Sequence, residues 1–216
     1  MGQQALVSVV GTVDYSAVVR TKIQKWYLPN EDNLTKAVER IMRVREQICA
    51  LLDEVAQLVG TEEMTNGVSA IKAYLDTSGF YYRPYSANGH HNFPGGLAEH
   101  CLGVCNEALR VGTGKYPRKS LIICGLFHDI CKADRFYFVG REIRAHRASG
   151  YGHSKRSVLI LKDHNFPLEE VEANAIYWHM KLYKANRHPF ARLIFDADKQ
   201  DCRNIKRKRT VRQVSQ

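Results

Sequence analysis

The chain has 216 residues, 44% of them hydrophobic and 25% charged, and this composition excludes collagen-like, mucin-like and wholly disordered proteins. Its length suffices for one domain with a sizeable core, or for one domain with a small addition. Its net charge is +10, and residues 203–216 carry six of the bases and no acid. We therefore expect a mildly basic body and a basic tail, which either contacts nucleic acid or is a solvated terminus.

Several sequence features bear on the compartment. No apolar run approaches the roughly 18 residues that span a bilayer, and the first four residues, Met-Gly-Gln-Gln, contain no base. We therefore expect neither membrane contact nor a secretory signal. Six Cys are too few for a disulfide scaffold in a chain of this length, so they are assigned to core packing. Together these features predict a cytoplasmic protein, and they leave its oligomeric state open.

Residues 1–30 are a segment of uncertain structure, because their Val-rich stretches fit strands or buried extended chain. A helix then follows from a cap at Asp32 or Asn33 to about Val59, where apolar residues recur at spacings of three, four and seven. The sequence predicts an all-α bundle over 31–202, with a short irregular or β-hairpin decoration and a tail at 203–216. Its other expected elements are a loop at 80–94, a hairpin at 136–143, and helices at 67–75, 97–111, 119–132, 153–164, 168–180 and 189–202.

His and acidic residues lie beside apolar segments of three expected helices. His128 and Asp129 directly follow the apolar run 121–127, and such a pair at the end of a buried segment is costly unless it is partnered or binds a metal. His100 lies near the start of another helix, and Asp198 follows an apolar segment of the last one. Imidazole nitrogens and carboxylate oxygens are ligands for Mn, Fe, Co, Ni or Zn. No CxxC pair exists, so a zinc finger is excluded.

Five segments within residues 90–200 resemble, in order, the HD-domain metal-dependent phosphohydrolase superfamily. Within the superfamily, the segments most resemble those of bacterial and phage HD hydrolases. They resemble the HD domains of certain 3′–5′ exoribonucleases more distantly. The resemblance implies an HD-domain helical bundle. The segments that carry it are His91-Asn-Phe-Pro-Gly-Gly-Leu-Ala-Glu-His100, Gly125-Leu-Phe-His-Asp-Ile-Cys-Lys132, Gly152-His153, Tyr177-Trp-His-Met180 and Asp196-Ala-Asp198.

The same resemblance implies the ligand set for one or two divalent transition-metal ions. Asp129 bridges the ions if there are two. His153 and His179 match the additional His of two-metal members, and in one-metal members such residues face the substrate phosphate. Asp201 lies close to the late Asp in sequence, but the Ala-Asp match favours Asp198. The resemblance implies that the first metal is held by His100, His128, Asp129 and Asp198.

Further candidates concern the substrate and catalysis. Lys132 follows Asp129 by three residues, hence on the same helix face, and is expected to pair with Asp129 or with a phosphate oxygen. We name both as catalytic candidates. His91, in the loop before His100, and the basic residues Arg144 and Lys155 are candidates for binding substrate. An ordinary loop His and a solvated basic face are the alternatives.

The chain lacks a GxxxxGK[ST] loop, which excludes a P-loop motor or kinase. We therefore expect a divalent-metal-dependent phosphohydrolase that cleaves a phosphate ester of a nucleotide or a nucleotide-like substrate. One alternative is a 3′–5′ exonuclease or phosphodiesterase acting on RNA or DNA ends with help from the basic tail. Another is a catalytically silent HD domain that binds nucleotide.

Overall fold

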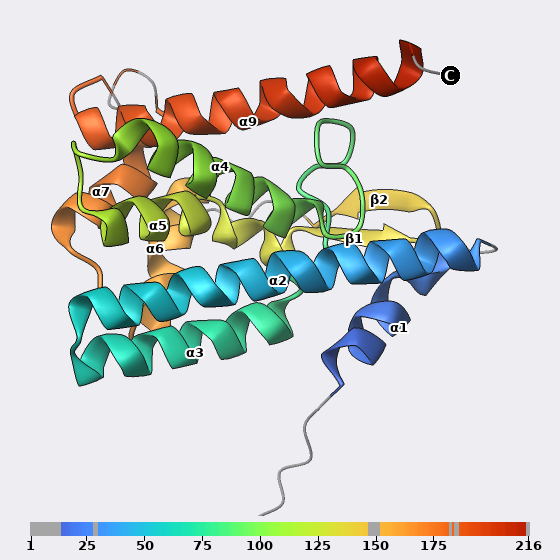
Figure 1. Ribbon diagram of the computed structural model, residues 1–216, viewed down its shortest axis with the longest axis horizontal. Helices are drawn as coiled ribbons and strands as arrows, with labels where there is room; N and C mark the ends of the chain where they lie inside the picture. Colours follow the sequence, from blue (N-terminus) through green and yellow to red (C-terminus); the bar gives the residue numbers. More distant parts are fainter. Residues whose placement is uncertain (1–13, 28–29, 147–151, 182, 184–185, 215–216) are drawn as a thin grey trace, which may run out of the picture.

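The computed structural model describes residues 14–27, 30–146, 152–181, 183 and 186–214, without the side chains of residue 153 and of 206 onwards. It is a helical bundle with one small antiparallel sheet in this part, which confirms the predicted all-α class with a hairpin (Figure 1). The described helices are α1 (Tyr15–Tyr27), α2 (Glu31–Val59), α3 (Glu62–Ser78), α4 (Gly96–Gly112), α5 (Arg118–Phe127), α6 (His153–Asp163), α7 (Glu170–Trp178) and α9 (Pro189–Val214). A 3-10 turn, η1 (Ile130–Asp134), precedes strands β1 (Phe136–Val139) and β2 (Glu142–Ala145).

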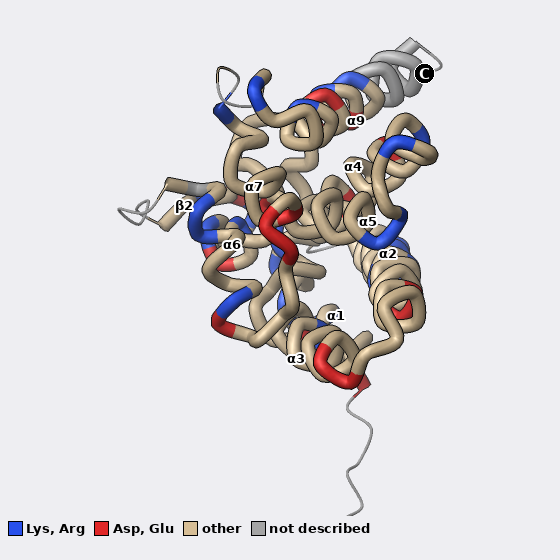
Figure 2. Tube along the Cα trace, turned by 90° about the vertical axis from the view of Figure 1, so that its left-hand side faces the viewer, with Lys and Arg blue, Asp and Glu red and all other residues tan. Residues whose placement is uncertain are grey.

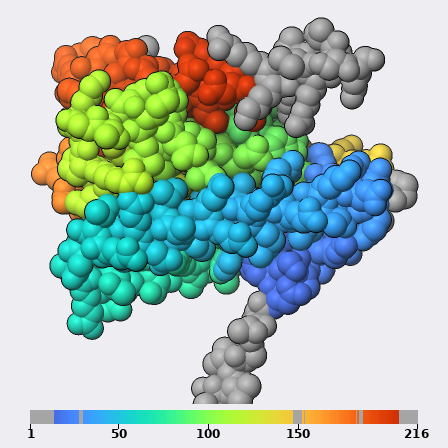
Figure 3. Space-filling model, in the orientation of Figure 1, coloured from blue at the N-terminus to red at the C-terminus, as the bar shows by residue number. Residues whose placement is uncertain are grey.

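Helix α4 is central to the arrangement, because it packs on α5, α9 and α2. Helix α2 lies across the face shown in Figure 3 and contacts α1, α3 and α5 as well. Its apolar stripe, which includes the fully buried Ile48 and Leu52, turns toward this core. The buried residues form one continuous cluster that runs from α1 to α9. The helices that carry the candidate ligands therefore share one core.

The N-terminal segment differs from the prediction in its described part. Residues 15–19, expected to be extended, begin helix α1, while residues 1–13 lie outside the described residues. Val19 and Ile23 lie one helical turn apart and are fully buried, and α1 packs on α2. Asp14 accepts hydrogen bonds from the backbone N–H groups of Ser16 and Ala17 at the start of the helix. Burial of one helical face has outweighed the strand preference of Val.

Two helices begin earlier than expected because of their caps. The Asn30 side chain, rather than Asp32 or Asn33, caps α2 by accepting from the Asn33 N–H at 2.9 Å. Thr61 caps α3 in the same way, so that Gly67 is inside the helix instead of at its start. There Gly67 lies against Pro167, which a Cβ atom would approach to 2.5 Å. A packing requirement, and not a turn, explains this glycine.

Helix α5 ends at Phe127, five residues earlier than predicted. Asp129 has φ −121°, outside the helical region, and the chain continues as the 3-10 turn η1. Lys132 therefore does not share an α-helical face with Asp129, although their charged groups still meet. At the other end of the chain, the backbone of 203–214 continues α9 as a helix. The hairpin follows the prediction, with Val139 paired to Glu142 around Gly140 at φ +58°.

Helices α4 and α5 approach closely at Gly125. A Cβ atom at this position would lie 2.5 Å from the Cys105 Cα, where backbone has to move. We expect Gly125→Ala to lower the free energy of unfolding by about 1–2 kcal/mol, because overpacking outweighs the helix preference of Ala. Thermal unfolding measures this loss as a midpoint lowered by several degrees. Gly152→Ala is the control, since no atom of the described residues lies within 4 Å of its Cβ position; equal midpoints for both variants would contradict the prediction.

Within the described residues, no helix is both long enough and apolar enough to cross a bilayer.

Candidate metal centre

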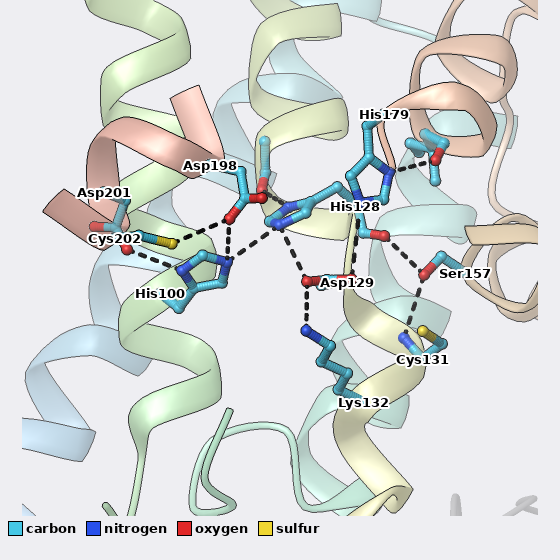
Figure 4. Close-up of polar contacts among 12 residues, drawn as sticks. His100, His128, Asp129, Cys131, Lys132, Ser157, His179, Asp198, Asp201 and Cys202 are labelled. Atoms are coloured by element: carbon cyan, nitrogen blue, oxygen red, sulfur yellow. Dashed lines mark hydrogen bonds and ion pairs between the residues drawn. The ribbon is translucent and has the colours of Figure 1, made fainter. Parts of the chain in front are cut away.

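Five buried polar side chains from four segments converge near the middle of the bundle (Figure 4). His100 comes from α4, and Asp198 comes from α9. His128 and His179 are the first residues after α5 and α7, and Asp129 follows His128. All five residues have at most 4% of their surface exposed. The structure thus brings together five of the six residues that the HD resemblance assigns to metal binding.

The ligand atoms face one another at short range. The Nε2 atoms of His100 and His128 are 3.3 Å apart, and His100 Nε2 is 3.4 Å from Asp198 Oδ1. Asp129 lies between the imidazoles of His128 and His179, with Oδ2 3.5 Å from His128 Nε2 and Oδ1 3.9 Å from His179 Nε2. Within the cluster, two triads have their ligand atoms within 4.8 Å of one another: His100 with His128 and Asp198, and His128 with Asp129 and His179. His128 belongs to both of these triads. A third group, His90 with His91 and His100, meets the same limit.

Hydrogen bonds at the opposite ring nitrogens fix which nitrogen of each imidazole carries the proton. His128 Nδ1 donates to the Gly125 carbonyl at 2.9 Å, and His179 Nδ1 donates to the Ile176 carbonyl at 2.7 Å. Because a carbonyl oxygen only accepts, the proton of a neutral imidazole is on Nδ1 in both cases. The Nε2 atoms then present lone pairs to the centre of the cluster.

The pKa values agree with neutral imidazoles. Burial, followed by the nearby His128, lowers the pKa of His100 well below its usual range. The same two causes lower the pKa of His179 to about 4. At neutral pH the cluster therefore has imidazole lone pairs and carboxylate oxygens directed at one another, which repel in the absence of a positive charge. A divalent cation fits this donor set, because neutral imidazole and carboxylate are its preferred ligands.

Comparison with known families agrees with this geometry. Residues 97–201 match the family model described as HD domain. This match is consistent with the HD-domain metal-dependent phosphohydrolase superfamily. HD domains are in general metal-dependent hydrolases, and the buried His and Asp groups fit metal binding. Searches of curated proteins and of solved structures gave no match to the chain.

Asp201 is a residue of the HD domain that the sequence prediction set aside. Its Oδ2 accepts a hydrogen bond from His100 Nδ1 at 2.8 Å, on the side of the ring away from His128. Asp198 and Asp201 are three residues apart on α9, so one helix face directs one carboxylate at each nitrogen of His100. Gly103 makes room for this contact, because a Cβ atom there would lie 2.1 Å from Asp201 Oδ1. The three-residue spacing was the available sequence signal.

The loop at 80–94 forms one wall of the HD site. Its backbone is tied to α4 by a hydrogen bond from the Leu97 N–H to the Arg83 carbonyl. Tyr85 lies inside, with its ring centroid 3.9 Å from that of His100. His91 is 1% exposed, and its Nε2 is 3.6 Å from Asp201 Oδ2. His91 therefore lies on the Nδ1 side of His100, where Asp201 also lies. A contact between His91 and the substrate stays a prediction.

Lys132 lies beside the cluster of His and Asp residues, as its candidate role in catalysis and substrate binding requires. Its Nζ is 2.9 Å from Asp129 Oδ2 and 3.4 Å from the centroid of the Tyr85 ring. Burial, followed by the charges of Asp129 and Asp198, raises the pKa of Tyr85, so its hydroxyl stays protonated and available as a donor. Lys132 is therefore a buried cation held between an aromatic face and the central carboxylate.

Two of the other three predicted residues are exposed, and the side chain of the third lies outside the described part. Arg144 is exposed on β2 and pairs with Glu142. Lys155 is exposed on α6. His153 is the first residue of α6, and its side chain lies outside the described part.

The prediction for the cysteines needs a correction. Cys101, Cys105, Cys124 and Cys131 belong to the core as expected, whereas Cys49 and Cys202 are only half-buried. Cys202 Sγ lies 2.9 Å from His90 Nε2 and 3.6 Å from Asp198 Oδ1, at the edge of the HD site. Its position one turn after Asp198 on α9 places it there.

Proposed function

We propose that this HD domain is a divalent-metal-dependent phosphohydrolase that cleaves a phosphate ester of a nucleotide or a nucleotide-like substrate. The observation that carries the proposal is the buried cluster in which neutral Nε2 atoms and two carboxylates face one another. His100, His128, Asp129 and Asp198 would hold one ion, and Asp129 with His179 would contribute to a second position. Such ions supply Lewis acidity that activates water and polarises a phosphoryl oxygen.

The side chains of the cluster support phosphoryl transfer directly. The Lys132 ammonium offsets negative charge that develops on the non-bridging oxygens of the phosphoryl group. Asp129 and the Tyr85 ring hold Lys132 in place, so no reorganisation is needed when that charge appears. The Asp201 carboxylate keeps the His100 proton on Nδ1, which leaves Nε2 free of a proton. Burial of the His100 ring excludes bulk water, and the low local dielectric strengthens each of these interactions.

A second candidate is hydrolysis at RNA or DNA ends, which the net charge of +10 favours. A third is a catalytically silent, nucleotide-binding HD domain. A screen of nucleotides and short oligonucleotides in the presence of Mn, Fe, Co, Ni or Zn, with identification of products, separates the three. Release of inorganic phosphate from mononucleotides supports the first, and stepwise shortening of oligonucleotides supports the second. Binding of nucleotides without turnover in the presence of each metal would support the third candidate.

The basic tail provides a test of the nucleic-acid candidate. We expect replacement of Lys206, Arg207, Lys208 and Arg209 by Gln to weaken oligonucleotide binding while hydrolysis of a small nucleotide stays unchanged. Each lost phosphate contact flattens the logarithmic salt dependence by about 0.7 for a single strand. Binding titrations at several salt concentrations measure this slope. An unchanged affinity and slope would make the tail a solvated terminus.

A further inference from the structure

Helix α6 presents a buried hydroxyl to the backbone of His128 and Asp129. Its outer face is charged, as the blue and red positions of α6 in Figure 2 show. Its buried residues recur at spacings of three and four, and they are Ser154, Ser157, Ile160 and Leu161. Ser157 is fully buried, and α6 packs on η1, the turn that directly follows Asp129. A hydroxyl in this position requires a hydrogen-bond partner.

The backbone at Asp129 has left the α-helical path. In a continuing helix the Lys132 N–H would donate to the His128 carbonyl, but it donates to the Asp129 carbonyl at 3.0 Å. Asp129 has φ −121° and ψ 18°, close to the sparsely allowed bridge region. Such a backbone conformation persists where the surrounding structure fixes it.

Ser157 binds the backbone on both sides of this break. Its Oγ donates to the His128 carbonyl at 2.9 Å and accepts from the Cys131 N–H at 3.4 Å, as the dashed lines in Figure 4 show. A hydroxyl has one donor and two acceptor sites, so it serves both backbone groups at once. The two bonds therefore hold the peptide groups that enclose Asp129 and Ile130.

The direction of the Asp129 carboxylate depends on this backbone. Its Oδ2 faces His128 Nε2 at 3.5 Å, and its Oδ1 faces His179 Nε2 at 3.9 Å. A rotation about φ or ψ of Asp129 would move both oxygens away from these nitrogens. Whatever fixes the backbone torsions of Asp129 thus also fixes the geometry of the cluster.

We propose that Ser157 is a positioning residue of the metal centre, which acts through the His128 carbonyl and the Cys131 N–H to aim the Asp129 carboxylate. The inference rests on the metal-binding role of Asp129 in the proposed function. It assigns to the centre a side chain whose two hydrogen bonds both go to backbone. The same bonds join the cluster to α6, the helix whose first residue is the candidate ligand His153.

Metal affinity of the folded protein tests this role without any substrate. We expect Ser157→Ala to lower the affinity for Co²⁺ about tenfold, at the lower end of the effect of residues that orient ligands, because Ser157 acts through the backbone. Competition with a chelating dye measures the affinity. The visible absorption of bound Co²⁺ should change as well, because it reports ligand geometry. Ser157→Thr keeps the hydroxyl and should restore most of the affinity and the spectrum. Ser157→Cys has a similar size and only a weak donor; it should resemble Ser157→Ala and covers the case in which that variant does not fold.

Arg156→Gln is the matched control. Arg156 forms an ion pair with Asp134 and so joins the same helix to the same turn, but this pair is partly exposed. We expect Arg156→Gln to keep the wild-type metal affinity. A lowered unfolding midpoint of Ser157→Ala with unchanged affinity and spectrum would overturn the positioning role, and so would an equal loss of affinity in Arg156→Gln. If wild type binds Co²⁺ but hydrolyses no phosphate ester, the hydrolase proposal fails and the order of affinities still decides the role of Ser157. A wild-type protein that binds no divalent ion would overturn both.

Discussion

Asp129→Ala and His128→Ala are each expected to abolish hydrolysis of phosphate esters and to lower the bound metal. Asp129 is the carboxylate that His128, His179 and Lys132 all face, and His128 belongs to both ligand triads. Even partners that only orient a ligand change metal affinity or activity by 10–100-fold, so loss of a ligand should leave below about 1% of the activity. Elemental analysis of the purified variants and initial rates across a metal titration measure both effects.

His164→Ala is the matched control for His128→Ala. His164 also makes a hydrogen bond from Nδ1 to a backbone carbonyl, that of Ile160, but it lies at the end of α6 beside Tyr74. We expect this variant to keep its metal and its rate. An enzyme that keeps most of its activity without Asp129 or His128 would show that the reaction takes place elsewhere.

Asp201→Ala is expected to lower metal affinity by about 10–100-fold, although Asp201 is not among the ligands that the HD resemblance assigns. Without its carboxylate, the His100 proton is no longer held on Nδ1, and the ring is free to turn Nε2 away from His128. Asp201→Asn should lose less, because an amide oxygen still accepts from Nδ1. Metal affinity, measured by competition with a chelating dye, orders the variants as wild type, Asn and Ala.

Gly103→Ala probes the same contact from α4. Its Cβ would displace Asp201 Oδ1, so we expect a loss of metal affinity in the same direction. Asp196→Ala is the control on α9, since Asp196 is exposed and pairs with Arg192. If Asp201→Ala binds metal as tightly as wild type, Asp201 does not position His100.

The sequence carried much of the fold and the order of the site residues. Helical periodicity around His100 and the apolar run before His128 sufficed to place His100 on a helix and His128 next to a buried helical segment of the same core. The Asn30 cap depends on one hydrogen bond from a backbone N–H to a side-chain oxygen, and the early end of α5 is marked by the backbone angle of Asp129. Apolar periodicity reports neither. The β-branched residues of α1 indicated strand, because the sequence did not reveal the partner against which they pack.

The supporting side chains of the site were harder to predict. Tyr85 is in a loop without periodicity, and its role depends on contacts with His100 and Lys132 that only the folded chain creates. Asp201 was considered and set aside, because a motif match distinguishes a ligand from its neighbours but does not identify the residue that orients another ligand. The two carboxylates of α9 are distinguished by their contacts across the bundle: Asp198 faces His100 Nε2, and Asp201 faces His100 Nδ1.

The hydrogen bond between His100 and Asp201 joins residues 101 positions apart. Because α9 is the last helix to be synthesised, the emerging chain contains His100 before it contains Asp198 and Asp201, the two carboxylates that face the nitrogens of this ring. The group formed by His128, Asp129 and His179 is complete in sequence before α9, whereas the group formed by His100, His128 and Asp198 is not. We therefore expect a chain truncated before Asp198 to lack the second group and the orientation of His100.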